Sequence, residues 1–317
     1  MSNQLRRQIT DQIVQALESN LVPWRRPWRS SKNAGRPTSV ATGRPYAGIN
    51  PLLCELHNNR FGFQSKLWGT FRQWKTLAGE VKRRPADVEP GEWGCKIVFY
   101  KQVVKQVVDA KTGQEDESRY LILKSFSIFN IDQVSGDHLD RFRVSKDIPP
   151  KVEVPTFGEA EKLIAATGAD LRFEGDRAYY KLPLPIGSWP NHDDGDFIVL
   201  PQREWFDRPE SYYETALHEL AHWSEIRLGW DEHARNYAMC ELVAEMSSCF
   251  VAAELGIPML ELTNHAAYLK NWLDAMRQDA NFIFKASSLA SKTSDFIVSF
   301  VRPNEKVEDE VAAEQVA

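Results

Sequence analysis

The stretch SYYETALHELAHW, residues 211–223, decides how this sequence is interpreted. On an α-helix, residues four positions apart lie on the same face, so His218 and His222 can bind one metal ion. Glu219 lies beside that face, where it can act as general base and accept a proton from the attacking water. The stretch therefore predicts a helix that carries a peptidase-like metal site. A chance pair of histidines on a solvated helix is the less favoured alternative.

A third protein ligand is expected, because catalytic zinc sites carry three. The metzincin pattern would place a histidine at position 228, but Leu228 stands there. The next helical segment is apolar nearly all round, yet it carries Glu241 and Glu245 one turn apart. A buried carboxylate needs a cation, a histidine or another donor nearby. The spacing from His222 to Glu241 resembles that of the gluzincins, and this resemblance implies Glu241 as the third ligand and Glu245 as the residue that orients a ligand histidine. Exchanged roles of the two glutamates are the alternative.

The chemistry of such a site needs further groups. A donor must stabilise the developing oxyanion, and Tyr268 or His265 can supply it, although packing is the simpler role for either side chain. The segment DFIVL, residues 196–200, is expected to be a strand whose edge receives an extended peptide. The expected cofactor is Zn²⁺, and the same ligands accept another divalent ion such as Mn²⁺.

The charge of the chain is divided unevenly between its halves. The total is −5, but residues 1–130 hold 21 Lys and Arg against 11 Asp and Glu, whereas residues 131–317 have a net charge of −15. This asymmetry favours a polyanion as the partner of the first half, and attraction between two domains is the alternative. The four cysteines are scattered and no apolar run approaches the roughly 18 residues of a membrane helix, so we expect a cytoplasmic protein without disulfides.

The basic half interleaves aromatic and basic residues. Nucleobases stack on aromatic rings while Arg and Lys contact phosphates, a combination that suits single-stranded DNA. For any one tryptophan a place in the core is the simpler interpretation, but the cluster with its excess charge favours nucleic acid. The predicted DNA-binding residues are Trp24, Arg25, Arg26, Trp28, Arg29, Arg44, Tyr46, Trp68, Arg72, Trp74, Lys75, Lys82 and Arg83.

Coarse patterns predict the fold class. Segments 51–62 and 65–79 are expected to be short helices, and segments 96–109 and 118–131 to form a long β-hairpin. The second half is expected to hold a small sheet followed by four helices, the first of which carries the two histidines. The sequence thus predicts an α+β protein with a mixed α/β N-terminal domain.

Domain boundaries follow from composition. Proline-rich residues 148–156 predict a linker, because proline interrupts regular structure. We expect a DNA-binding domain over residues 1–147 and a metal-binding domain over residues 157–302. The acidic segment 303–317, rich in small residues, is expected to be a disordered tail.

Six blocks of sequence carry a resemblance to a known family. They are PWRRPW (23–28), GRPYAGINPLL (43–53), LWGTFRQWKTLAG (67–79), HELAHW (218–223), ELVAE (241–245) and NHAAYLKNWL (264–273). In this order, over about residues 5–300, the blocks resemble the ArdC family of antirestriction proteins of conjugative plasmids. Glu241 lies 19 residues beyond His222, a spacing similar to that of the gluzincins. One departure is Cys240, because family members often have a second glutamate there.

The resemblance implies an N-terminal domain that binds single-stranded DNA and a C-terminal zincin-like, gluzincin-type metallopeptidase domain. It also implies that the protein protects incoming plasmid DNA from host restriction. We expect the protein to enter the recipient cell with the transferred DNA, or to be made there soon after transfer. One alternative is a shield that coats DNA and has a structural, non-catalytic metal site. Another is a protease of a host protein that DNA merely localises.

Overall fold

The structure is a computed structural model that describes residues 2–25, 33–108, 115–144, 155–183, 195–230, 236–257 and 266–302. The helices are α1 (Ser2–Glu18), α2 (Asn50–Phe61), α3 (Phe71–Thr76), α4 (Pro155–Thr167), α5 (Pro209–Arg227), α6 (Tyr237–Leu255), α7 (Ala266–Gln278) and α8 (Phe282–Ser299). The strands are β1 (Thr38–Ser39), β2 (Leu67–Gly69), β3 (Glu80–Val81), β4 (Cys95–Val108), β5 (Glu115–Asn130), β6 (Val134–Ser135), β7 (Leu171–Phe173), β8 (Tyr179–Lys181) and β9 (Phe197–Leu200). Short 3-10 helices are η1 (Ile131–Gln133), η2 (Asp137–Phe142) and η3 (Arg203–Trp205).

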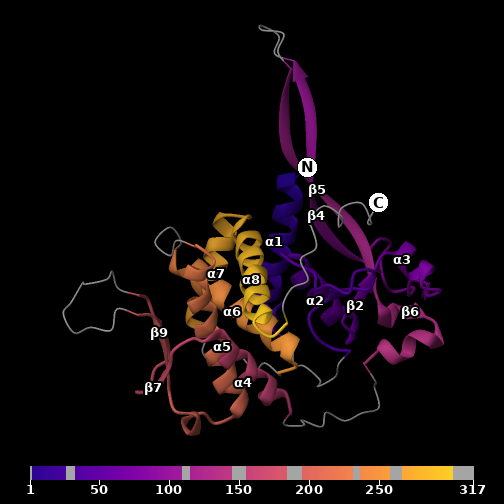
Figure 1. The fold of residues 1–317 in the computed structure, drawn as a ribbon. Coiled ribbons are helices and arrows are strands. Elements are labelled where there is room, and N and C mark those ends of the chain that lie inside the picture. Colours follow the sequence, from indigo (N-terminus) through magenta and orange to yellow (C-terminus); the bar gives the residue numbers. More distant parts are fainter. Residues whose placement is uncertain are drawn as a thin grey trace.

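The N-terminal part is built on the expected long hairpin. β4 and β5 pair in antiparallel register from Cys95 opposite Ile128 to Val108 opposite Glu115. The sheet continues through β2 to β1, in the order β1-β2-β5-β4. Figure 1 shows the hairpin extending from the body of the molecule as a two-stranded ribbon. The prediction of an α+β fold with a long hairpin is confirmed.

The segment 65–79 is not the single short helix that its pattern predicts. Its first part is β2, which pairs with β1 and β5, and only the six residues of α3 are helical. Thr70 stands between them as N-cap, and its side chain accepts a hydrogen bond from the backbone N–H of Gln73. Its own backbone N–H donates to Oε1 of Gln73 at 2.8 Å, which completes a capping box. The helix therefore begins where the local cap allows it, after the strand has used its backbone groups in the sheet.

Trp74 belongs to a small second core. Its side chain is fully buried against Ile131, Val134 and Leu139, and its Nε1–H donates to the backbone oxygen of Phe129 at 2.9 Å. We expect Trp74→Ala to lower the free energy of unfolding by about 3–5 kcal/mol, because it removes a large buried ring and leaves a cavity. Denaturant titration of the full chain measures this loss.

The matched control for Trp74→Ala is Phe71→Ala on the same helix. The Phe71 ring is 57% exposed, so its removal should change the free energy of unfolding by no more than about 0.5 kcal/mol. Equal losses in the two variants would contradict the second core.

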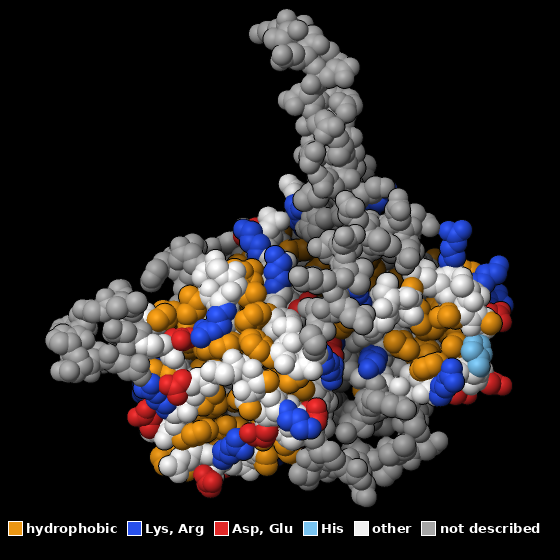
Figure 2. All heavy atoms as spheres, viewed as in Figure 1, with side chains coloured by type: hydrophobic (Ala, Val, Ile, Leu, Met, Phe, Trp, Pro, Cys, Tyr) orange, Lys and Arg blue, Asp and Glu red, His pale blue; other side chains and the backbone are white. Residues whose placement is uncertain are grey.

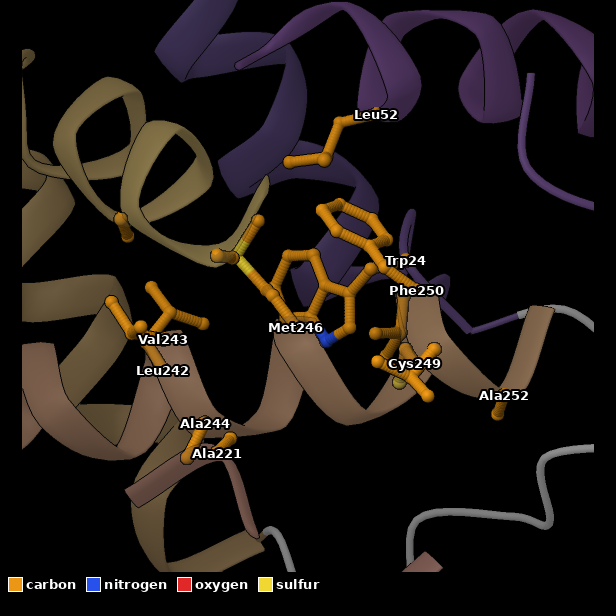
Figure 3. Packing of buried hydrophobic residues seen from close by; sticks show 14 of the residues in the cluster. Trp24, Leu52, Ala221, Leu242, Val243, Ala244, Met246, Cys249, Phe250 and Ala252 are labelled. Atoms are coloured by element: carbon orange, nitrogen blue, oxygen red, sulfur yellow. The ribbon is translucent and has the colours of Figure 1, made fainter. Parts of the chain in front are cut away.

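The two halves of the chain share the main hydrophobic core. Buried residues of α1 and α2 belong to the same cluster as those of α5, α6 and α8. Figure 3 shows Trp24 from the N-terminal part among Leu52 of α2 and Met246 and Phe250 of α6. The proposed boundary between the domains is therefore crossed by a continuous packed interior.

The C-terminal part carries the small sheet that the sequence predicts. Its strand order is β7-β9-β8, with β9 parallel to β7 and antiparallel to β8. The segment DFIVL is thus the central strand, and the expectation that its edge receives a peptide is wrong. β8 is an outer strand of this sheet. No helix in the described part of the chain has the length and apolar character to cross a membrane.

Candidate metal centre

The two histidines lie where α5 faces α6. Pro209 begins α5 after Arg208, whose backbone is extended, and proline at the first helical position needs no hydrogen-bond partner for its nitrogen. The Nε2 atoms of His218 and His222 lie 3.2 Å apart. Both side chains are partly buried, and both line a cleft.

Glu241 on α6 completes this group. Its Oε2 lies 3.4 Å from Nε2 of His218, and its Oε1 lies 3.8 Å from Nε2 of His222. The three ligand atoms are all within 4.8 Å of one another. Two imidazole nitrogens and one carboxylate oxygen make the donor set of a catalytic zinc site, so these residues fit a divalent metal ion. Glu241 as the ligand remains a prediction that this geometry favours.

Glu245 has different partners. It is buried, and its Oε1 accepts a hydrogen bond from Nε of Arg25 at 2.6 Å. The predicted role of Glu245 in orienting a ligand histidine is therefore wrong, because an arginine from the N-terminal part holds it. This ion pair with Arg25 also weakens Glu245 as the alternative ligand.

Glu225 lies beside the ring nitrogen of His222 that faces away from Glu241. Its side chain is completely buried, and its Oε1 lies 3.6 Å from Nδ1 of His222. Burial by itself lowers the pKa of His222, but Glu225, Glu219 and Glu241 raise it above its ordinary value. A carboxylate beside the second ring nitrogen fixes which nitrogen faces a metal ion. The signal in the sequence was the spacing of three residues from His222, which places Glu225 on the same helix face.

Glu219, the predicted general base, lies beside the two histidines in the cleft. Its side chain is buried, with 8% of the residue exposed, and it lines the cleft between the histidines and β8. Burial raises the pKa of Glu219, while His218 and His222 partly oppose that effect. A carboxyl whose pKa is above its usual range is suited to taking up and returning a proton.

The cleft has a volume of about 520 Å³ and aromatic walls. Tyr179, Tyr180 and Leu182, in and just after β8, line one side, and the backbone N–H of Tyr180 donates to Glu219. On another side the hydroxyls of Tyr237 and Tyr268 lie 3.0 Å apart. An extended peptide bound in this cleft would lie beside β8 and the metal ligands.

Tyr237 was not found by sequence reasoning. It stands one turn before Glu241, hydrogen bonds to that carboxylate, and its ring is 62% exposed at the rim of the cleft. Burial raises the pKa of Glu241, but the contacts with His218, His222 and Tyr237 outweigh burial and lower it. Tyr268 stacks on Trp272 with ring centroids 6.1 Å apart and reaches the cleft through its hydroxyl. Its predicted role as oxyanion donor stays a prediction.

Several predicted DNA-binding residues are buried, and the prediction is wrong for them. Trp24, Trp68 and Trp74 are at most 3% exposed, so no base can stack on their rings. Arg25 is ion-paired with two glutamates, and its side chain is 7% exposed. The physical reason is that an indole removes more apolar surface from water when it packs in a core than when it is left on the surface for a ligand.

The other predicted DNA-binding residues have different environments. Tyr46 is partly buried against the main core. Exposed side chains among the predicted residues are those of Arg44, Arg72, Lys75, Lys82 and Arg83. Arg26, Trp28 and Arg29 lie outside the described residues, as do His265, the tip of the hairpin, most of the predicted linker and the tail 303–317.

Two family models match the chain. One is described as the N-terminal domain of anti-restriction factor ArdC and matches residues 3–129, and the other is described as a zincin-like metallopeptidase and matches residues 158–289. The protein y4eC of Sinorhizobium fredii (strain NBRC 101917 / NGR234) is 30% identical over 91% of this chain and 90% of its own length. The DNA primase TraC of Escherichia coli is 31% identical over 92% of this chain, which spans 27% of the primase.

Two solved structures of an ArdC protein are also similar to this chain. The metal-free crystal structure of antirestriction protein ArdC from plasmid R388 is 30% identical to this chain, with a TM-score of 0.72 and coverage of 95% of this chain and 99% of the other. The Mn(II)-bound structure of that protein is 29% identical, with a TM-score of 0.66 and the same coverage.

Proposed function

The chain belongs to the ArdC family of antirestriction proteins, and we propose that it binds single-stranded DNA and hydrolyses peptide bonds at a divalent-metal centre. The observation that carries the peptidase proposal is the convergence of His218, His222 and Glu241 beside the buried Glu219 in an open cleft. We further propose that the protein acts in the cytoplasm, where it protects incoming plasmid DNA from restriction during conjugation. We propose that residues 1–147 form the DNA-binding domain and that residues 157–302 form the metal-binding domain.

Zn²⁺ is the metal that we propose, and the Mn(II)-bound structure of a relative supports a divalent ion as the cofactor. The donor set of two histidines and one glutamate suits zinc at a catalytic site and also accepts manganese. A divalent ion bound there supplies Lewis-acid chemistry, which polarises a carbonyl and lowers the pKa of water.

The chain itself supplies binding, orientation and proton transfer. β8 presents its outer edge to an extended peptide, and the exposed Tyr179 and Leu182 offer apolar contact to its side chains. Glu219 accepts a proton from the attacking water and returns it to the leaving amine. The hydroxyl of Tyr268, which lies 3.0 Å from that of Tyr237, donates a hydrogen bond to the developing oxyanion.

The surface proposed for single-stranded DNA is the lobe of α3, β3, β6 and η2. It exposes Phe71 and Leu77, together with the side chains of Arg72, Lys75 and Lys82. Figure 2 shows Lys and Arg side chains around an apolar patch on this lobe. Exposed Phe71 takes the place of the buried tryptophans as the ring on which a base stacks, and the cations beside it contact phosphates.

The double substitution Arg72→Gln with Lys75→Gln should weaken single-stranded DNA binding and reduce its salt dependence. Each phosphate contact with a single strand contributes about 0.7 to the slope of log affinity against log salt, so the slope should fall in magnitude by about 1.4. Fluorescence anisotropy with a labelled oligothymidine at several salt concentrations measures it.

The control for the DNA-binding variant removes two exposed lysines of the C-terminal part, Lys162 and Lys285, by the same change to glutamine. Its salt slope should equal that of the wild type. If both double variants lose the same slope, the charge of the whole chain drives binding, and the α3 lobe is not the site.

The experiment that tests the antirestriction proposal is transfer of unmodified plasmid DNA into a restricting recipient. Transfer with the wild-type gene should give many more transconjugants than transfer without it, and a non-restricting recipient should abolish the difference. Equal efficiency in the restricting recipient would contradict the proposal.

A further inference from the structure

Arg25 occupies a buried position between the two helices that carry the metal ligands. Its Nε lies 2.6 Å from Oε1 of Glu245 on α6, and its Nη2 contacts Oε1 of Glu214 on α5. The side chains of Arg25, Glu245 and Glu214 are 7%, 2% and 18% exposed. One guanidinium thus pairs with two carboxylates that are largely out of water.

The two glutamates have matching positions relative to the metal ligands. Glu214 precedes His218 by one helical turn on α5, and Glu245 follows Glu241 by one turn on α6. Residues four apart share a helix face, so the two carboxylates and the two ligands lie along the same contact between the helices. A force that draws Glu214 and Glu245 together also sets how His218 faces Glu241.

The arginine comes from far away in the chain. It lies 220 residues before Glu245 and follows α1 in the N-terminal part. Its neighbour Trp24 is buried in the shared core, where its ring meets Trp272 of α7 edge to face at 6.2 Å. Figure 3 shows the same indole beside Met246 of α6. The backbone that carries Arg25 is therefore fixed against the helices of the C-terminal part.

We propose that Arg25 is a positioning residue of the metal centre, supplied to it by the DNA-binding half of the chain. The inference rests on the metal site of the proposed function. Arg25 remains charged in any protein environment, and its planar fork of N–H donors can bind two carboxylates at once. Without it, Glu214 and Glu245 repel each other in a poorly solvated space, α5 and α6 move apart, and the ligand atoms no longer converge.

A buried arginine can position residues near a metal site, or it can only hold two parts of the chain together. Arg36 is the matched comparison, since its side chain is 2% exposed and it joins the N-terminal part to Asp295 of α8 at 2.8 Å. Loss of Arg36 removes an ion pair between the same two parts of the chain without touching Glu214 or Glu245. A role of Arg25 in docking alone would make the two arginines equivalent.

The test is titration of full-length wild type, Arg25→Gln and Arg36→Gln with Co²⁺ in place of the native metal. The visible absorption of Co²⁺ reports both affinity and ligand geometry. Residues that support metal ligands typically change affinity about 10–100-fold, so Arg25→Gln should raise the Kd by at least tenfold and shift the absorption bands. Arg36→Gln should bind Co²⁺ within about twofold of the wild type, with unchanged bands.

The Co²⁺ titrations distinguish failure of the proposed metal site from failure of the positioning role of Arg25. If the wild type binds no Co²⁺, the proposed metal site itself fails. If the wild type binds and Arg25→Gln has the same Kd and spectrum, or Arg36→Gln weakens binding equally, the positioning role is overturned. Should Arg25→Gln not fold, Arg25→Lys replaces it, because lysine keeps the charge and loses the fork; a higher Kd with shifted bands supports the proposal, and wild-type values overturn it.

Discussion

Glu241→Gln should lose its metal ion at concentrations that saturate the wild type. The substitution keeps the size of the side chain but replaces a charged ligand oxygen with a neutral amide beside His218 and His222. Removing a residue that hydrogen bonds to a metal ligand typically lowers metal affinity about 10–100-fold. Removing a direct ligand should therefore lower the affinity by more than about 100-fold. Metal content after dialysis, measured by plasma emission spectroscopy, gives the result.

Thermal unfolding offers a second measurement of the same change. A metal ion that binds the folded chain at 100 times its Kd stabilises that chain by about 2.7 kcal/mol. Added Zn²⁺ should therefore raise the Tm of the wild type and leave that of Glu241→Gln nearly unchanged.

The matched control for Glu241→Gln is Glu254→Gln on the same helix. Glu254 pairs with Arg302 at 3.3 Å, well away from the histidines along α6, so this variant should retain its metal. Glu245→Gln distinguishes the ligand from its neighbour. If the metal is lost completely in Glu245→Gln and kept in Glu241→Gln, the assignment of the third ligand must be exchanged.

Glu219→Gln should retain the metal and lose hydrolysis. The amide has nearly the shape of the buried carboxylate, and both histidines remain, but it cannot accept a proton. Removal of a general base typically lowers the rate about 10²–10⁴-fold. The expected result in the transfer assay is loss of protection of unmodified plasmid DNA, with single-stranded DNA binding equal to that of the wild type.

The opposite result has a definite meaning. Unchanged protection by Glu219→Gln, with the metal still bound, would contradict a hydrolytic role in antirestriction and favour a shield that coats DNA around a structural metal site. If protection and DNA binding fell together, the substitution would have disturbed the fold. The melting temperature and the salt slope of DNA binding identify that case.

The positions of the metal residues were accessible to sequence reasoning because they depend on helical spacing. His218, Glu219 and His222 are set by one turn of α5, and Glu241 lies on the helix that follows. The hairpin could also be predicted, since its β-branched and aromatic runs differ from the helical pattern around them. The spacing also places Glu225 on the helix face of His222. Its contact with that histidine could not be predicted, because spacing alone does not show whether a side chain is buried.

Residues whose role depends on burial were assigned incorrectly. Trp24 and Arg25 belong to an interleaved aromatic and basic run, and such a run has the same appearance whether its rings stack on bases or pack in a core. The same difficulty affected DFIVL, because an apolar strand of this length can be central or outer in a sheet. Only the neighbours of each residue in space distinguish the two cases.

The α+β class, the long hairpin and the helix that carries His218 and His222 could be predicted from the amino-acid sequence, because these features follow from local spacing and residue type. The packing of the folded chain was needed to show that Arg25 of the basic half contacts the helices of the other half, and that Glu245 pairs with this arginine while Glu241 contacts the histidines. Burial and charge pairing depend on contacts between residues of different elements, such as Arg25 and Glu245, which lie 220 positions apart, and local patterns do not encode such contacts.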